Sequence, residues 1–164
     1  DLGLIMGPVV AQGIENHEIC SLRCSWFASP RLGLPAGRLT IAALAAHPIL
    51  AFSRGSQPYR TLERILQAAG VARPRQHTQK TNATKVRHAR DGRGRTRLPD
   101  AVIPQLARRG DLRQLDVDML FPPLVFHAVC GATPRQGIAQ AIATMAREEA
   151  ARFDAPHHAS GRIG

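Results

Sequence analysis

The sequence predicts an α/β protein with a largely parallel or mixed sheet, in which short buried strands alternate with amphipathic helices. Two observations carry this prediction. An apolar run at 49–52 leads into a segment, 57–69, whose apolar residues recur at helical spacing, and a second apolar run at 124–130 leads into another such segment. The chain has 164 residues, 44% of them hydrophobic, so it can bury a core in one domain or in two small lobes.

The predicted strands are short apolar or alternating runs bounded by glycine, proline or polar residues. They cover residues 2–6, 19–28, 49–52, 76–79, 95–98, 112–117 and 124–130. The run at 19–28 is predicted as one strand because Cys20, Leu22, Cys24 and Trp26 alternate onto one face.

The predicted helices combine capping residues with apolar residues at helical spacing. They cover 40–45, 57–69, 82–90, 100–109 and a final helix that starts at 133–134. The segment 57–69 is the best supported, because Leu62, Ile65, Leu66 and Ala69 follow the helical repeat and Gly70 follows as a C-terminal cap. The tail 154–164 is expected to be disordered.

Positive charge is concentrated in the middle of the chain. The formal net charge is +10, and residues 61–110 carry twelve Lys/Arg against three Asp/Glu, a balance of 12 − 3 = +9. A nucleic-acid-binding face and a solvated basic surface both explain this cluster. No aromatic residues are interleaved with the charges as stacking platforms, which favours the solvated surface.

The three cysteines predict free thiols in a reducing cytoplasm. His17, Cys20 and Cys24 resemble half of a zinc site, but a structural site needs four ligands, and Cys130 has no ligand partner at metal spacing. We therefore expect no metal and no cofactor. The longest apolar stretch, 39–52, is broken by His47 and Pro48 and is too short to span a bilayer, so we expect no membrane partner.

An enzyme is not expected, since the chain has neither a Gly-x-Ser-x-Gly elbow nor a phosphate loop. The turn Ser53–Arg54–Gly55–Ser56 joins a buried strand to a helix with Pro58 in its first turn. Its free N–H groups and helix dipole suit an anion, although Ser56 could merely cap the helix. The same alternatives hold for a second helix start, from Thr78 to Asn82.

Five segments in order resemble the effector-binding (substrate-binding) domain of LysR-type transcriptional regulators. They are Asp1–Pro8, His47–Ser56, Val86–Pro99, Leu112–Val117 and Pro123–Val129. The resemblance implies a two-lobed fold like the type 2 periplasmic binding proteins, with the effector between the lobes. Residues 1–27 and 123–153 would form an incomplete first lobe and 28–122 the second lobe, with the family's winged helix-turn-helix and half of lobe one missing upstream, so that we expect a fragment or processed product.

The resemblance also implies a site for a small, anionic metabolite and no catalysis. The expected effector-binding residues are Gly7, Pro8, Ser53, Arg54, Gly55, Ser56, Thr78, Thr81 and His127. DNA would be bound only through the upstream helix-turn-helix, and the full-length cytoplasmic protein would be a homo-oligomer. A solute-binding protein of a transport system and a basic nucleic-acid-binding module are the alternative functions. Arg95 and Arg97 stand where the family has apolar residues, and because burying both guanidiniums is costly, we expect either that their faces are solvated or that the sequence is degraded.

Overall fold

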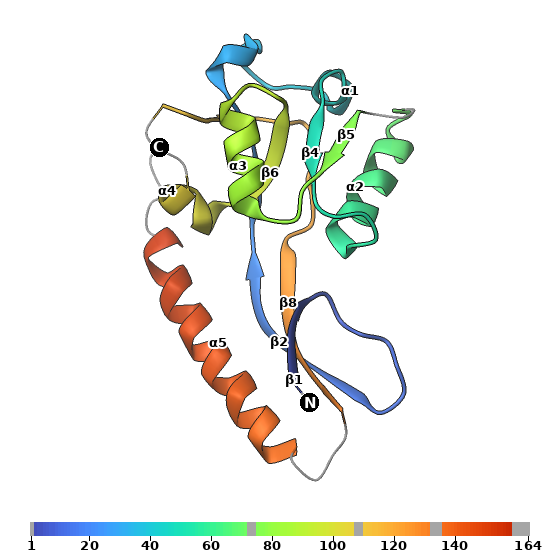
Figure 1. Ribbon diagram of the computed structural model, residues 1–164, viewed down its shortest axis with the longest axis vertical. Helices are drawn as coiled ribbons and strands as arrows, with labels where there is room; N and C mark the ends of the chain where they lie inside the picture. The colour runs from blue at the N-terminus through green and yellow to red at the C-terminus, as the bar shows by residue number, and fades with distance from the viewer. Residues whose placement is uncertain (1, 72–74, 107–109, 132–135, 159–164) are drawn as a thin grey trace. The chain divides into compact units, whose positions relative to one another are not determined.

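A computed structural model describes residues 2–71, 75–106, 110–131 and 136–158 (Figure 1). The chain divides into two compact units, Asp1–Arg23 with Pro123–Gly164, and Cys24–Pro122. The first boundary follows Arg23 rather than residue 27, because the strand that starts at Cys24 pairs only with strands of the second unit. Among the described residues, no helix combines the length and the apolar character that crossing a bilayer requires.

The first unit is a three-stranded antiparallel sheet with one long helix. Its strands are β1 (Leu2–Met6), β8 (Leu124–Gly131) and β2 (Ile14–Leu22), in that spatial order, and the helix α5 (Gln136–His158) packs against β2 and β8. Residues 154–158 are therefore helical, which corrects part of the predicted tail, since the run 146–155 is rich in strong helix formers. Residues 159–164, like the predicted helix start at 133–134, lie outside the described residues.

The second unit is built on a mixed five-stranded sheet in the order β5-β4-β6-β3-β7. The strands are β3 (Cys24–Ala28), β4 (Ile49–Ala51), β5 (Gln76–Thr78), β6 (Arg95–Pro99) and β7 (Arg113–Leu115). The helices are α1 (Ile41–Ala45), α2 (Gln57–Ala68), α3 (Asn82–Arg90), α4 (Ile103–Leu106) and two 3₁₀ turns, Pro30–Leu32 and Asp100–Val102. β4 runs parallel to β5 and β6, and β3 is antiparallel to β6 and β7.

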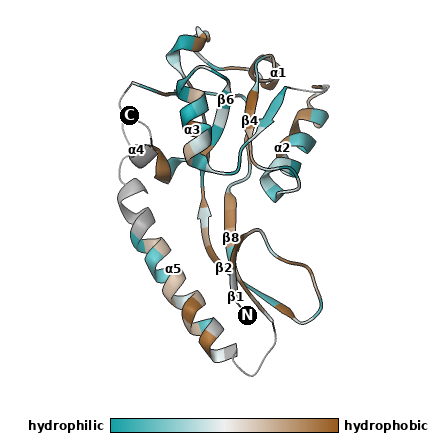
Figure 2. Cartoon of the chain, in the orientation of Figure 1, coloured by the Kyte–Doolittle hydropathy of each residue, from teal (hydrophilic) through white to brown (hydrophobic). Residues whose placement is uncertain are grey.

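The two main helices of this unit cover opposite faces of the sheet. Leu62 and Leu66 of α2 pack in one core cluster with Trp26 of β3, whereas Val86 of α3 packs in a second cluster with Phe27. Trp26 and Phe27 are neighbours on one strand, so their side chains point to opposite faces. The hydropathy colouring accordingly shows β4 as apolar, whereas α2 and α3 carry both hydrophilic and hydrophobic residues (Figure 2).

The strand predicted at 19–28 is two strands in different sheets. β2 ends at Leu22 and pairs with β8, whereas β3 starts at Cys24 and pairs with β6 and β7. Alternation of side chains continues through the break, so the pattern alone could not reveal that the partner strand changes there.

Of the two alternatives for the basic residues of β6, the one with solvated faces is wrong. Arg95 is 1% and Arg97 8% exposed, and Lys85 of α3 is fully buried at 0%. Backbone carbonyls satisfy some of the buried donors: Arg95 donates through Nη1 to the carbonyl oxygens of Ala43, at 2.6 Å, and of Leu44, whereas Nε of Arg95 and Nε of Arg97 have no hydrogen-bond partner. These are unpaired carbonyls in the last turn of α1, where a cation is favourable.

Candidate functional site

The two helix starts predicted to bind an anion lie at one edge of the second unit's sheet. β4 and β5 are parallel, with Ala51 opposite Thr78, and the N–H of Gln79 donates to the carbonyl of Ala51 at 3.0 Å. Each strand ends here and leads into a helix, α2 on one face and α3 on the other. When two adjacent parallel strands lead into helices on opposite faces of a sheet, a crevice forms at the carboxyl ends of those strands. Ligands of such sheets usually bind in this crevice.

The first turn is held by its own capping bonds. Ser56 is the N-cap of α2: its hydroxyl accepts from the N–H of Tyr59 at 3.4 Å and donates to the carbonyl of Ser53 at 2.7 Å. Gly55 has a φ of 82°, a conformation that favours glycine, and its carbonyl accepts a hydrogen bond from Arg60. The hydroxyl of Ser56 therefore caps the helix, while Ser53 and Arg54 are exposed on the turn.

The second turn has the same construction. Thr81 is the N-cap of α3, and its hydroxyl accepts from the N–H of Thr84 at 3.1 Å and lies 2.9 Å from the Thr84 hydroxyl. Thr78, at the end of β5, is exposed. One hydroxyl-bearing residue at each strand end, Ser53 and Thr78, is thus exposed beside a capped helix start.

A buried cation adjoins this edge, and the sequence analysis did not assign it a role. Nζ of Lys85 lies 3.2 Å from the ring centroid of Phe52, the residue between β4 and Ser53, and it donates to the carbonyl of Arg97 at 3.1 Å. Burial lowers the pKa of Lys85 to about 7; the neighbouring Cys24 raises it and Arg97 lowers it further. The spacing of Lys85 one turn before the buried Ala89 was the signal that could have placed it on the inner face of α3.

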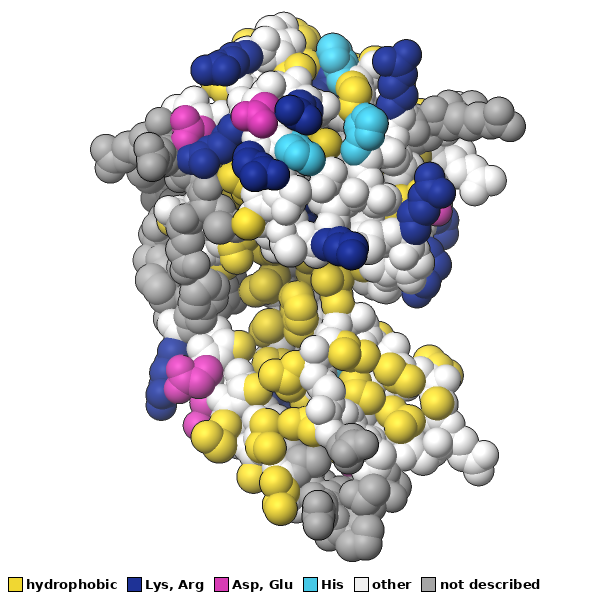
Figure 3. Space-filling view, in the orientation of Figure 1, with side chains coloured by type: hydrophobic (Ala, Val, Ile, Leu, Met, Phe, Trp, Pro, Cys, Tyr) yellow, Lys and Arg dark blue, Asp and Glu magenta, His cyan; other side chains and the backbone are white. Residues whose placement is uncertain are grey.

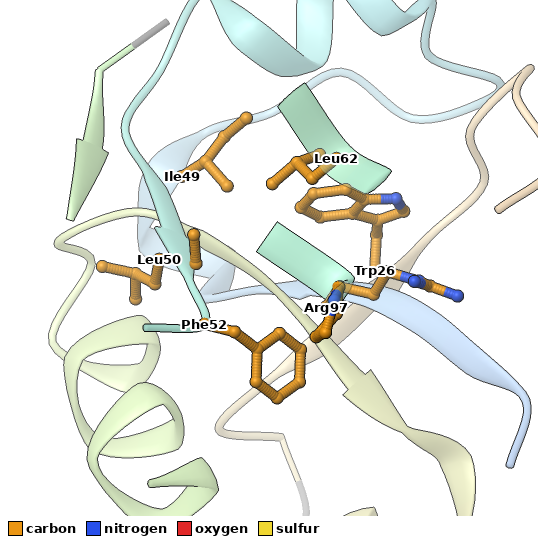
Figure 4. Close-up of a pocket in the computed structure, with 8 residues that line it drawn as sticks. Trp26, Ile49, Leu50, Phe52, Leu62 and Arg97 are labelled. Carbon is orange, nitrogen blue, oxygen red and sulfur yellow. The ribbon is translucent and has the colours of Figure 1, made fainter. Parts of the chain in front are cut away.

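Arg97 provides a second cation on the α2 side of the sheet. Its Nη2 donates to the carbonyl of Pro122 at 2.5 Å, and its guanidinium carbon lies 5.1 Å from the centroid of the Phe121 ring. Burial lowers the pKa of Arg97, and Cys24 and Asp100 oppose that shift. Figure 4 shows Arg97 and Phe52 beside Trp26 in a small cavity, whose lining also includes Ile49, Leu50, Ala51, Pro58 and Leu62.

Three predicted site residues belong to the first unit and so are not part of this edge. Gly7 is buried with a φ of 80°, and its N–H donates to the carbonyl of Val125 at 2.8 Å, which extends the pairing of β1 with β8. Pro8 is exposed. His127 is half-buried on β8, and its Nδ1 is buried with no hydrogen-bond partner.

The cations of the basic segment that the structure describes do not form one continuous charged face. Lys85, Arg95 and Arg97 are buried, and Arg90 pairs with Asp111 at 2.5 Å. The exposed cations are divided among α2, α3 and the connections around them: Arg64, Arg75, Lys80, Arg87 and Arg93. The visible face of the second unit accordingly shows separate Lys and Arg side chains interspersed with His (Figure 3).

Comparison with known proteins gives the family. The family model described as the LysR substrate binding domain matches residues 1–151. The chain belongs to this family. No curated protein sequence matches the chain.

Solved structures of LysR-type proteins have the same fold at low sequence identity. A Corynebacterium glutamicum OxyR C206 mutant matches with a TM-score of 0.76 and 16% identity over 100% of this chain and 52% of its own, so the chain spans about half of that protein's length. The Synechocystis PCC6803 CcmR regulatory domain in complex with 2-PG gives 0.72 and 17% over 90% and 72% of the two chains. The effector binding domain of QuiR in complex with shikimate gives 0.69 and 10% over 91% and 72%. The LysR substrate binding fold is therefore present, with α/β units of the periplasmic-binding-protein-like type.

Proposed function

We propose that the chain is the effector-sensing part of a LysR-type transcription regulator and that it binds a small anionic metabolite at the carboxyl edge of β4 and β5. The observation that carries the proposal is the parallel pairing of Ala51 with Thr78, which sets the starts of α2 and α3 at one edge. Ser53 and Thr78 would donate hydrogen bonds to the anion. Arg54 would add a cation at the same turn.

Electrostatics at this edge support an anion over a neutral or cationic ligand. The first N–H groups of two helices point out of their N-termini, where the helix dipole is positive. Ser56 and Thr81 each satisfy one of these donors by capping. Because Pro58 has no N–H, the first turn of α2 offers a ligand only the N–H of Gln57, whereas α3 offers those of Asn82 and Ala83. Arg97, buried next to the edge and to Phe52, adds positive charge behind it, and Lys85, with a pKa of about 7, adds a second positive charge when it is protonated.

Binding in this proposal makes and breaks no bond. The anion would favour one conformation of the domain, and the regulator would read that conformation. In the full-length protein, a helix-turn-helix upstream would contact DNA, and the subunits would associate. Because the DNA of a bacterial cell lies in the cytoplasm, the protein would act there. Gly7, Pro8 and His127 of the first unit enter as further candidate effector residues, tested by their own substitutions.

The alternative functions have less support. A nucleic-acid-binding module would need its cations on the surface, but three of the described ones are buried and two, Arg90 and Arg93, are paired with carboxylates. A solute-binding protein of a transport system shares the fold. The upstream reading frame distinguishes a solute-binding protein from a regulator. A helix-turn-helix there would support the regulator, and an export signal there would support the transport protein.

The test is calorimetry of the chain against a panel of small carboxylates and phosphates that includes shikimate. Trp26, the only tryptophan, lines the cavity beside Phe52, so its emission gives a second readout of binding. Ser53→Ala and Thr78→Val should each weaken binding about tenfold, the usual effect of losing one hydrogen bond to a charged group.

Thr40→Ala is the matched control. Thr40 caps α1 by accepting from the N–H of Ala43 at 3.1 Å, and α1 precedes β4, so this cap lies at the opposite edge of the sheet. Its loss should leave affinity unchanged. Equal affinity in the parent chain, Ser53→Ala and Thr78→Val would contradict the site assignment, as would the same loss in Thr40→Ala.

A further inference from the structure

Three side chains of metal-binding type meet on one face of the first unit's sheet. In the antiparallel pair of β2 and β8, Glu15 lies opposite Cys130, and His17 lies opposite Ala128. Residues directly opposite each other, and residues two apart on one strand, share a face. One ligand atom from each of Glu15, His17 and Cys130 therefore comes within 4.8 Å of the other two.

The sequence hides this group because its members are far apart in the chain. Spacing suggests His17 with Cys20 and Cys24 instead, but Cys24 belongs to β3 in the second unit. A bulge between Glu18 and Cys20 places Cys20 opposite Phe126, farther from Cys130 along β8. Cys20 there lines a cavity with residues of α5. Only the pairing of β2 with β8 brings Cys130 to His17.

The three ligands suit a transition metal of the zinc class. A thiolate, an imidazole and a carboxylate form a mixed S, N, O set that Zn²⁺ accepts, whereas Mg²⁺ and Ca²⁺ prefer oxygen alone. In a tetrahedral site, neighbouring ligand atoms are about 3.5 Å apart. The observed spread of up to 4.8 Å needs small rotamer shifts, and the Nε2 of His17 is already 3.5 Å from a Glu15 oxygen.

The three ligands differ in exposure, so one side of the group is open to solvent, as a metal site with one water ligand requires. Cys130 is 2% exposed, while the side chains of His17 and Glu15 are 26% and 38% exposed. The Nε2 atom of His17 is itself buried and makes no hydrogen bond, and the Glu15 carboxylate lies 3.5 Å from it. A metal ion would accept coordination from this nitrogen, and water would take the fourth coordination position of the metal.

We propose that Glu15, His17 and Cys130 bind a zinc-class divalent metal ion, which joins β2 to β8 within the first unit. Binding requires that the Cys130 thiol release its proton, so affinity rises with pH. The site is independent of the anion site proposed on the second unit.

Cobalt(II) is the probe, because a tetrahedral cobalt thiolate gives both visible ligand-field bands and a near-ultraviolet charge-transfer band. Titration of the reduced full chain should show one cobalt per chain with both signals, and added zinc should displace the cobalt. Cys130→Ser should abolish the charge-transfer band and weaken cobalt affinity by at least about tenfold. His17→Gln should weaken affinity by a similar factor but keep the charge-transfer band, because the Cys130 thiolate is still present.

Cys20→Ser is the matched control, because Cys20 lies on the same strand and face but outside the ligand group. It should leave the spectrum and the affinity unchanged. If Cys130→Ser fails to fold by circular dichroism, Glu15→Gln, at a more exposed position, carries the test through its loss of affinity. The absence of a thiolate band in the parent chain, its persistence in a folded Cys130→Ser variant, its loss in Cys20→Ser, or unchanged affinity in Glu15→Gln and His17→Gln would overturn the proposal.

Discussion

Replacing Lys85 by methionine should remove a large pH dependence from the stability of the second unit. Lys85 is fully buried, and burial lowers its pKa from 10.5 to about 7 in the folded protein. Between these two values the unfolded chain binds a proton that the folded chain does not. The free energy of unfolding therefore rises with pH from about 7 to about 10.5, at roughly 1.4 kcal/mol per pH unit.

The magnitude follows from the same difference. Over the full window the ionisation of Lys85 contributes about 5 kcal/mol, an upper figure because compact unfolded states shield part of the charge. Below pH 7 the folded protein must bury an ammonium group, and this cost is fully present. Lys85→Met avoids the cost but loses the hydrogen bond to the Arg97 carbonyl and the contact of Nζ with the Phe52 ring, each about 1 kcal/mol.

We therefore expect Lys85→Met to be more stable than the parent chain at pH 6 to 7, with an advantage that shrinks toward pH 10. Urea unfolding of both proteins across this range, followed by Trp26 emission, measures the difference. Lys80→Met, at an exposed position, is the control and should give a curve parallel to the parent. A parallel curve for Lys85→Met would refute the reasoning.

Two further substitutions test the packing around β4 and β6. Gly94→Ala would bring a Cβ to 2.5 Å from the carbonyl oxygen of Pro48, so the strand must shift, and urea unfolding should show a loss of about 1–3 kcal/mol. Arg95→Met removes the donor to the carbonyls of Ala43 and Leu44. We expect the free energy of unfolding to fall by about 1–3 kcal/mol and amide exchange in α1 to become faster. Unchanged amide exchange in α1 would show that Arg95 does not stabilise this helix.

Elements defined by local signals were predicted closely. The helix expected at 57–69 is Gln57–Ala68, and the strand expected at 49–52 is Ile49–Ala51. The apolar repeat and capping residue of the helix, and the apolar run of the strand, lie within or directly beside the element itself, so more distant parts of the chain add little information. The family was also predicted correctly, because the order of several weak motifs is more specific than any one of them.

Features that depend on pairing between distant segments were not predictable in this way. The break at Arg23 between β2 and β3 is invisible in the alternation of side chains, since only the partner strands change. The meeting of Cys130 with Glu15 and His17 depends on the register of β2 with β8. Register is a tertiary property, and no spacing along one strand encodes it.

The burial of Arg95 shows why a desolvation cost alone does not decide where a basic side chain lies. Desolvation argues against burying Arg95 and Lys85, but that estimate assumes that no partner is available. Here Arg95 meets the unpaired carbonyls that end α1, and Lys85 meets a carbonyl of β6 and the face of Phe52. Burial lowers the pKa of Arg95 only to about 10, so it stays charged at neutral pH.

The two residues therefore act differently at the two ends of β4. At its start, Arg95 has a permanent charge that is already matched by the carbonyl end of α1. At its end, Lys85 has a pKa of about 7, so its charge depends on what lies nearby. An anion bound at the turn after Phe52 would raise that pKa and draw a proton onto Lys85. The edge proposed for the effector is thus also the edge where the protein's charge can respond to occupancy.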